Sequence, residues 1–361
     1  MRVIASSRRV KFVRGSTGLH TVFCIDGGPV CTCPAFTFRG WCRHTALCGV
    51  GSLVDVLEID EYAEKERRVF KSSLNAINEL YDGEPYASDL VFAVYGLPNV
   101  GKTLLMLQEA AWLESQGYNI LYIDTEGSVT TTARRWLPVF RARFKSSKKR
   151  GRIYAVVLKT VESYAEFFGW KIKLDLKGGK QKDKGAKMEL SFIDREREDR
   201  IEAWRVMREK KIDFVIVDSI TMPIRTRVPS SPQNLVVKSD LEGFMLGQLM
   251  YAQDLFGVGV IATFHASINP TNPYDTSADI RGGLAVKHTA KHIMYIEWRQ
   301  KKELRSIRQF WLVRKPDAEP WSMVRFTRID DMGYHDLAVS NDKLGELLTG
   351  SQLKRLGGGS R

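Results

Sequence analysis

The segment from Gly96 to Thr103, GLPNVGKT, places two glycines, a lysine and a threonine at the spacing GxxxxGK[ST]. In this pattern the backbone N–H groups of the loop surround phosphate oxygens, the lysine reaches the β- and γ-phosphates, and the threonine hydroxyl binds Mg²⁺. Lys102 is therefore a candidate catalytic residue as well as a nucleotide-binding residue. We assign nucleotide binding to Gly96, Asn99, Val100, Gly101, Lys102, Thr103 and Leu104.

Two acidic residues follow apolar runs further along the chain. Asn119–Ile123 leads into Asp124-Thr125-Glu126-Gly127, and Asp213–Val217 leads into Asp218. Asp218 could hold Mg²⁺ through water beside Thr103, and Glu126 could orient and deprotonate an attacking water. Together they predict in-line phosphoryl transfer. Each acid alone could instead have a structural role, such as a helix N-cap.

Cysteine placement indicates a metal site near the N-terminus. All five cysteines lie within the first 48 residues, and in a reducing compartment such clustering usually reflects metal binding. Cys31-x-Cys33, eight residues and Cys42-x-His44 supply three thiolates and one imidazole, which suit a closed tetrahedral Zn²⁺ site. The two cysteines outside this pattern are expected to be buried, or to replace a ligand in another register; they are Cys24 and Cys48.

The elements that must position these residues are those of an α/β protein. Strands are predicted at Leu90–Tyr95, Asn119–Ile123, Asp213–Val217 and Gly259–Phe264, with a helix from Leu104 to Ser115. The continuous apolar runs are typical of parallel strands buried on both faces. We predict four segments: a β-rich zinc-binding domain at 1–55, a linker helix at 56–70, an ATPase core with a mainly parallel sheet at 71–345, and a flexible tail at 346–361.

The N-terminal pattern resembles the SWIM zinc finger, in which Cys-x-Cys and Cys-x-His follow a β-hairpin. The match covers residues 8–55 and implies binding of DNA or protein. Residues 1–50 hold seven basic residues and one acid, which favours DNA.

The order of motifs in the core resembles the RecA/RadA recombinase superfamily over residues 70–340. The shared parts are GLPNVGKT, YIDTEG, FVIVDS, a strand ending in a polar sensor, and a loop closed by Gly282-Gly283. The resemblance implies a RecA-like P-loop ATPase core in which Glu126 is the catalytic carboxylate. It places His265 at the γ-phosphate sensor position, where the family usually has Gln. No helix-hairpin-helix module precedes the core, which favours a RadA paralogue over the main recombinase.

The same resemblance implies two loops that face DNA. They fall at about residues 225–240, with Arg225, Arg227 and Lys238, and at 266–287, with Arg281 and Lys287. Either could instead be an ordinary connection. Basic residues near a late hairpin reach the ATP of the adjacent subunit in bacterial relatives, so Arg314 and Lys315 are candidates for that role.

Charge favours a polyanionic partner. The chain carries 55 Lys+Arg against 42 Asp+Glu, a formal net charge of +13. Nine basic residues and no acid lie in 134–152, and seven lysines against two acids lie in 171–187. Period-two alternation in 171–192 predicts a β-hairpin with lysines on its exposed face. It could grip a phosphate backbone, contact another subunit, or carry a disordered tip, and the basic runs could also be solvated loops.

These features predict a cytoplasmic, nucleoid-associated protein, because no apolar run reaches the length of a membrane span and no secretory signal is seen. The expected function is a Mg²⁺-dependent ATPase that binds single-stranded and duplex DNA and assembles as a homo-oligomer, a filament or a ring, for recombination or repair. One alternative is an ATP-switched mediator with little hydrolysis that acts on the main recombinase. A second alternative is a ring helicase or KaiC-like ATPase.

Overall fold

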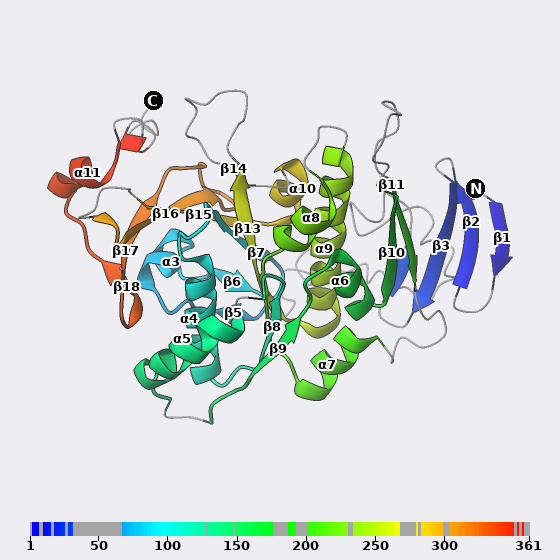
Figure 1. The fold of residues 1–361 in the computed structure, drawn as a ribbon, viewed down its shortest axis with the longest axis horizontal. Helices are drawn as coiled ribbons and strands as arrows, with labels where there is room; N and C mark the ends of the chain where they lie inside the picture. The colour runs from blue at the N-terminus through cyan, green and yellow to red at the C-terminus, as the bar shows by residue number, and fades with distance from the viewer. Residues whose placement is uncertain are drawn as a thin grey trace.

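A large sheet runs through the middle of the protein (Figure 1). The computed structural model describes residues 2–6, 10–15, 18–25, 28–31, 67–127, 129–146, 149–175, 187–192, 201–229, 234–267, 279–280, 283–298, 304–349, 352–353 and 356. The strands of the large sheet are β7 (Val91–Gly96), β8 (Ile120–Asp124), β9 (Ile153–Val157), β12 (Phe214–Asp218), β13 (Gly259–Ser267), β14 (Asp279–Ile280), β15 (His292–Trp298), β16 (Ile307–Arg314), β17 (Val324–Asp330) and β18 (Gly333–Leu337).

The order of the strands is β18-β17-β16-β15-β7-β13-β12-β8-β9, and β14 pairs with β13. From β15 to β9 neighbouring strands are parallel. From β15 to β18 they are antiparallel. The prediction of an α/β protein with a mainly parallel central sheet is therefore confirmed for the described residues.

Helices cover both faces of this sheet (Figure 1). On one side lie α3, α4 and α5, and on the other α6 to α10. None of the helices in the described ranges has the length and apolar character needed to cross a bilayer. Their bounds, with that of the C-terminal helix α11, are α3 (Asn75–Leu80), α4 (Lys102–Ser115), α5 (Val129–Arg143), α6 (Val161–Phe167), α7 (Glu202–Lys210), α8 (Thr221–Arg227), α9 (Leu235–Phe256), α10 (Gly283–Thr289) and α11 (Asn341–Leu347).

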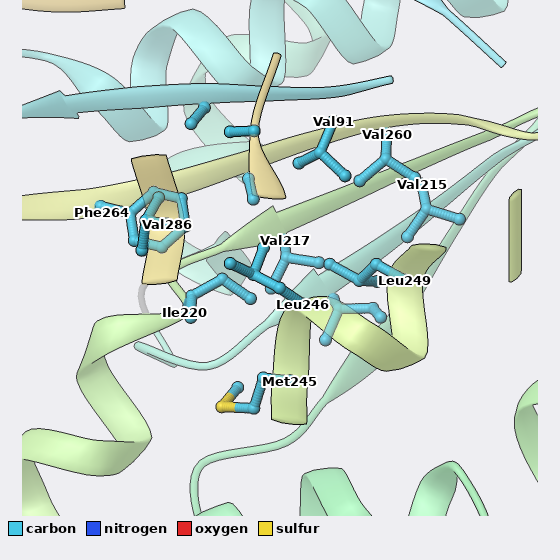
Figure 2. Close-up of a cluster of buried hydrophobic side chains, with 14 of the residues drawn as sticks. Val91, Val215, Val217, Ile220, Met245, Leu246, Leu249, Val260, Phe264 and Val286 are labelled. Carbon is cyan, nitrogen blue, oxygen red and sulfur yellow. The ribbon is translucent and has the colours of Figure 1, made fainter. Parts of the chain in front are cut away.

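Side chains alternate between the two faces because a strand has a period of two. In β12, Val215 and Val217 enter one apolar core, whereas Phe214 and Ile216 enter the other. Figure 2 shows the first of these cores, where the β12 valines lie against side chains of α9 such as Leu246. Burial on both faces explains why these strands are continuous apolar runs.

The predicted strand ends agree closely with the structure except at His265. The strand predicted to end at Phe264 continues through His265 to Ser267. The extension pairs Ala266 with Ile280 of β14, which satisfies backbone groups beyond the end of the apolar run. Beyond β7, the late hairpin, whose strands the sequence predicts at 309–313 and 322–329, corresponds to β16 and β17. The strands that flank it, β15 and β18, are not predicted, and neither are β9 and β14.

A separate antiparallel hairpin lies between the two motif strands β8 and β12 in the sequence. It consists of β10 (Trp170–Asp175) and β11 (Lys187–Phe192), as the alternation predicts. Lys173 stands opposite Glu189, so the exposed face of the described strands is not purely basic. The lysine-rich tip at 176–186 lies outside the described residues.

The described part of the N-terminal segment forms a separate antiparallel sheet, within the range where the sequence predicts a β-rich zinc-binding domain. Its strands are β1 (Arg2–Ser6), β2 (Val10–Gly15), β3 (Gly18–Ile25) and β4 (Gly28–Cys31). Cys31 is the last residue of β4, and the other proposed zinc ligands, Cys33, Cys42 and His44, lie outside the described residues.

The ends of the core differ from the predicted domain bounds. The sequence predicts a linker helix at residues 56–70. Within the described end of this range, Val69–Phe70 forms a strand instead, β5, which pairs with β6 (Tyr86–Ala87). The flexible tail was expected from residue 346, yet Leu347 and Leu348 are buried. Apolar side chains at these positions pack against the core, so the core extends past its predicted end.

Part of the basic run at 134–152 is used inside the protein. Arg141 and Arg150 both form ion pairs with the buried carboxylate of Glu114, at 2.6 and 3.2 Å. Arg143 donates to the carbonyl oxygens of Met332 and Tyr334. These three residues serve the fold, which reduces the part of this run that is available to a polyanion.

A buried carboxyl group joins helix α4 to the segment that precedes β7. Glu109 accepts hydrogen bonds from the hydroxyls of Ser72, Ser73 and Tyr86 and from the Ser73 backbone N–H. Burial raises the pKa of Glu109 to about 7, although the hydrogen bonds, from Ser73 foremost, oppose that shift. The neutral form is therefore favoured in the folded protein up to neutral pH.

This raised pKa predicts a pH-dependent stability. Because the folded pKa lies above the ordinary 4.5, proton binding by Glu109 stabilises the folded state. This stabilisation is fully present below pH 4.5 and is lost as the pH rises through 7. The side chain of Glu109→Gln is always neutral and does not lose this stabilisation. The unfolding free energy of the variant minus that of the wild type should therefore increase by roughly 3 kcal/mol between pH 4.5 and pH 7.5. Urea unfolding across this range measures the gain. The control is Glu166→Gln, an exposed glutamate of α6, and an equal pH profile for wild type and Glu109→Gln would contradict the assignment.

Candidate active site

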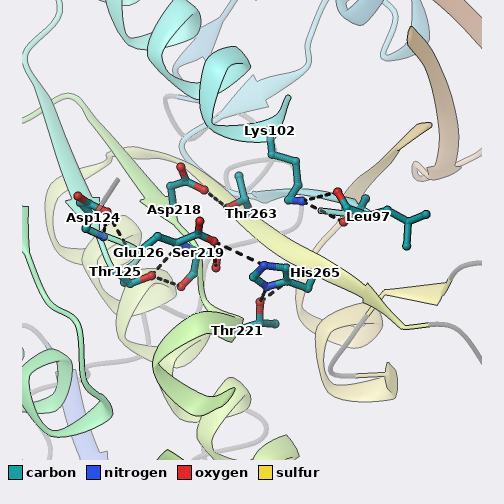
Figure 3. Close-up of polar contacts among 12 residues, drawn as sticks. Leu97, Lys102, Asp124, Thr125, Glu126, Asp218, Ser219, Thr221, Thr263 and His265 are labelled. Carbon is teal, nitrogen blue, oxygen red and sulfur yellow. Dashed lines mark hydrogen bonds and ion pairs between the residues drawn. The ribbon is translucent and has the colours of Figure 1, made fainter. Parts of the chain in front are cut away.

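The sequence motifs meet at the carboxyl ends of four adjacent parallel strands. β7 leads into the loop 96–101, β8 ends at Asp124, β12 ends at Asp218, and β13 carries His265. In open parallel sheets this edge is where ligands bind. Figure 3 shows the polar side chains of these loops facing one another.

The loop 96–101 needs glycine at both ends. A Cβ on Gly96 would lie 2.6 Å from the Ile296 carbonyl oxygen, and one on Gly101 would lie 2.4 Å from the Tyr334 hydroxyl. Gly101 also has a φ of +105°, which other residues rarely adopt. The close approach of β15 and β18 therefore requires glycine at both positions, independently of any ligand.

Lys102 begins helix α4 and turns back over the loop. Its Nζ donates to the carbonyl oxygens of Gly96 and Leu97, at 2.9 and 3.0 Å, as Figure 3 shows. Burial lowers the pKa of Lys102, while the charges of Asp218 and Glu126 oppose that shift. The ammonium group is thus held between the loop and two carboxylates.

Asp218 is buried at the end of β12 and is held by hydroxyl groups. Thr263 Oγ1 donates to its Oδ1 at 2.6 Å and Tyr122 Oη donates to its Oδ2 at 3.1 Å. Burial raises the pKa of Asp218, and hydrogen bonds from Thr263, then Thr103 and Tyr122, oppose the shift. The contact with Thr103 brings together the two residues that the sequence assigns to Mg²⁺.

Asp124 shapes the loop that carries Glu126. Its Oδ1 accepts from the backbone N–H groups of Glu126 and Gly127, at 3.0 and 2.8 Å, and its Oδ2 accepts from Val129 at 3.2 Å. This is the cap that a carboxylate supplies where a helix begins. Asp124 has a structural role here, and Glu126 projects from the loop it stabilises.

Thr125 and Ser219 join the loops after β8 and β12. The Thr125 hydroxyl donates to the Ser219 carbonyl at 2.6 Å and accepts from the Ser219 N–H at 2.7 Å. The Thr125 N–H donates to the Asp218 carbonyl at 2.9 Å. Both side chains are buried, so the distance between the Glu126 and Asp218 backbones is fixed.

Glu126 is half-buried and faces His265. Ser219 Oγ donates to its Oε1 at 3.0 Å, and His265 Nε2 lies 3.6 Å from the same oxygen. Burial and then the charge of Asp218 raise the pKa of Glu126, while Ser219 and Lys102 oppose the shift. A carboxylate in such surroundings is a stronger base than one in water.

His265 is buried on β13 and is positioned by Thr221. Its Nδ1 lies 2.6 Å from Thr221 Oγ1, and the same oxygen accepts from the His265 backbone N–H at 3.1 Å. If the threonine hydroxyl donates to Nδ1, Nε2 carries the proton of the neutral ring and points toward Glu126. His265 can then act as a hydrogen-bond donor at this edge.

The basic residues assigned to DNA lie in helices more than in loops. Arg225 and Arg227 belong to α8, Lys238 to α9 and Lys287 to α10. Arg227 pairs with Glu162 at 2.6 Å and Lys287 with Asp279 at 2.7 Å. The loops predicted at 225–240 and 266–287 are therefore shorter than expected; Arg281 lies outside the described residues.

Arg314 and Lys315 lie at the opposite edge of the sheet from the loop 96–101. Arg314 pairs with Ile293, beside the start of β7, whereas Gly96 pairs with Ile296. Lys315 forms an ion pair with Asp82. Neither residue reaches the site of its own chain, so a role for them requires a second subunit.

Four side chains of the site were missed by the sequence analysis: Tyr122, Ser219, Thr221 and Thr263. Tyr122 stands two positions before Asp124, and Thr263 two positions before His265. Because side chains of a strand alternate between its two faces, each of them could have been expected on the same face as the residue two positions later. Ser219 and Thr221 act through a tertiary contact with other strands and carry no such signal.

Neither models of known protein families nor curated protein sequences match this chain.

Loss of the Thr125 hydroxyl should destabilise the protein. Thr125→Val keeps the shape but leaves the buried N–H and carbonyl of Ser219 without partners, at a cost of about 3 kcal/mol in unfolding free energy. Thr125→Ser keeps the hydroxyl and is the matched control. Chemical denaturation of the two variants makes the comparison, and equal stabilities would refute the role of this contact.

Proposed function

We propose that this chain is a DNA-binding, Mg²⁺-dependent ATPase of the RecA-like class, resembling RadA paralogues, that assembles on DNA in recombination or repair. One observation carries the catalytic part. Lys102 at the start of α4, Asp218 at the end of β12 and Glu126 in the loop after β8 face one another at one edge of the sheet (Figure 3). Loops of this sequence bind nucleoside triphosphates, and the two acids supply what hydrolysis needs.

The oxygen ligands present fit Mg²⁺. Asp218 and Thr103 offer a carboxylate and a hydroxyl, hard oxygen donors of the kind that Mg²⁺ prefers, beside the loop that would hold the phosphates. When bound, Mg²⁺ neutralises charge on the β- and γ-phosphates. Hydroxyl donors from Thr263 and Tyr122 keep the carboxylate oriented.

Glu126 is the candidate base. Its loop is held by Asp124 and Thr125, so the carboxylate has a defined position at the carboxyl edge. Its raised pKa makes it a better proton acceptor while leaving it close to the positive charge of Lys102. Its role is to orient a water molecule and remove its proton.

DNA binding is proposed from charge and from the family resemblance. The excess of positive charge and the helices α8 and α10, which hold Arg225 and Lys287 beside this edge of the sheet, support it. Arg227 and Lys287 would have to exchange their carboxylate partners for phosphates. Assembly into an oligomer would let Arg314 and Lys315 reach the nucleotide of a neighbouring subunit.

His265 favours a second candidate function, an ATP-switched mediator with little hydrolysis. Its Nε2 lies 3.6 Å from the oxygen of Glu126 that also accepts from Ser219. A protonated His265 would form an ion pair with Glu126 and take the carboxylate away from water. Such a site would bind ATP and turn it over slowly.

We further propose that Cys31, Cys33, Cys42 and His44 bind a structural Zn²⁺. The β1–β4 sheet that precedes the last three of these residues supports a small module of the SWIM type. Such a module has little core and commonly depends on its metal.

ATP hydrolysis with and without DNA tests the main proposal. Lys102→Ala should abolish tight ATP binding, while Glu126→Gln should still bind ATP but hydrolyse it at least a hundredfold more slowly. Lys343→Ala, an exposed lysine of α11, is the control. We expect single-stranded DNA to stimulate the wild type. ATP binding with negligible turnover under every condition would instead support the mediator.

Metal analysis tests the zinc site. Protein purified without chelators should contain one zinc per chain, and Cys33→Ser together with Cys42→Ser should lose it. Cys48→Ser is the matched control and should retain the metal. Absence of stoichiometric zinc from the wild type would remove this part of the proposal.

A further inference from the structure

The far side of the phosphate-binding loop is held by two residues of the antiparallel part of the sheet. Arg308 of β16 donates from Nε to the Val100 carbonyl oxygen at 2.7 Å, and the Tyr334 hydroxyl of β18 donates to the same oxygen at 3.3 Å. Both side chains are buried. The sequence motif gives no sign of either residue, since both lie more than 200 positions further along the chain.

We propose that Arg308 and Tyr334 are positioning residues for the triphosphate. In a trans peptide the carbonyl and the N–H point in opposite directions. Fixing the Val100 carbonyl toward β16 and β18 therefore turns the Gly101 N–H the other way, toward the side on which the loop would hold phosphate. The inference rests on the proposed nucleotide binding and adds the residues that prepare the loop for it.

Tyr334 is itself rigidly held. Its N–H donates to Gln108 Oε1 at 2.7 Å, and Gln108 Nε2 donates to its carbonyl at 3.1 Å. Gln108 lies on α4, the helix that begins at Lys102. The tyrosine thus joins β18 to both the loop and its helix, and its hydroxyl occupies the space that a side chain at position 101 would need.

Arg308 brings a buried positive charge to the back of the loop. Its Nη1 donates to the carbonyl oxygens of Arg305 and Ile307, its side chain also forms a hydrogen bond with the Tyr334 hydroxyl, and its guanidinium lies over the Trp298 ring, 5.2 Å from the centroid. Among the described residues its partners are carbonyls, a hydroxyl and this ring, with no carboxylate. A buried cation without a carboxylate favours an anion nearby, which is what a bound triphosphate would supply.

Binding of Mg²⁺ and a fluorescent mant-ATP analogue tests the proposal. Tyr334→Phe removes only the hydroxyl and should raise Kd about three- to tenfold, and Arg308→Met should raise it at least tenfold. Arg308→Lys keeps the charge and should lie between Arg308→Met and the wild type. Because both residues donate to one oxygen, the double variant should lose less than the product of the two single effects.

The controls are matched to the type of side chain. Tyr81→Phe removes a buried hydroxyl that has no hydrogen-bond partner among the described residues, and Arg325→Met removes an arginine that binds Glu79 away from the loop. Both should keep the wild-type Kd even if they lower the melting temperature. In steady-state hydrolysis, Tyr334→Phe should raise KM with kcat changed less than twofold, which a general loss of stability would not produce.

The outcomes separate the two proposals. If the wild type binds mant-ATP in a Lys102-dependent manner and Tyr334→Phe and Arg308→Met bind it equally well, the positioning role is wrong and the proposed function stands. If the wild type does not bind the nucleotide, both are wrong. Should Arg308→Met fail to fold, Tyr334→Phe decides the question alone.

Discussion

Negative charge concentrated at the carboxyl edge of the sheet is the constraint that organises this protein. Asp124 and Asp218 stand opposite each other at the ends of two paired strands, and Glu126 lies two residues after Asp124. Carboxylates so close together and so buried are costly unless donors surround them. The N–H groups of the β8 loop and the hydroxyls around Asp218 supply those donors, and the ammonium of Lys102 adds a positive charge that favours Asp218 and Glu126 in their ionised forms. The polar network of the site thus stabilises the acidic ends of these two strands.

The antiparallel extension from β16 to β18 contributes more than additional area. It lies beside the strand β15 that approaches Gly96, and its own residues hold the Val100 carbonyl from behind. A loop of irregular backbone needs such external partners for its polar groups. The parallel strands therefore lead into the acidic side chains and carry His265, while the antiparallel strands set the shape of the loop 96–101 that lies beside them.

Positive charge is divided between the fold and the surface. Arg141 and Arg150 neutralise the buried Glu114, and Arg308 is enclosed behind the loop. Counting charge along the sequence cannot separate such residues from those that could meet a polyanion, since the partner of each is defined only by packing. The predicted DNA contacts face the same limit, because Arg227 and Lys287 already have carboxylate neighbours.

The sequence by itself determined the parallel core and the main groups of the site. Apolar runs that end in acids, and a glycine-lysine-threonine loop between a strand and a helix, are local patterns, and each side chain follows from its place in one element. Only the tertiary structure decided the roles of Tyr122, Ser219, Thr263 and Arg308. These depend on which strands become neighbours and on contacts between residues far apart in the chain, which no spacing within one element encodes.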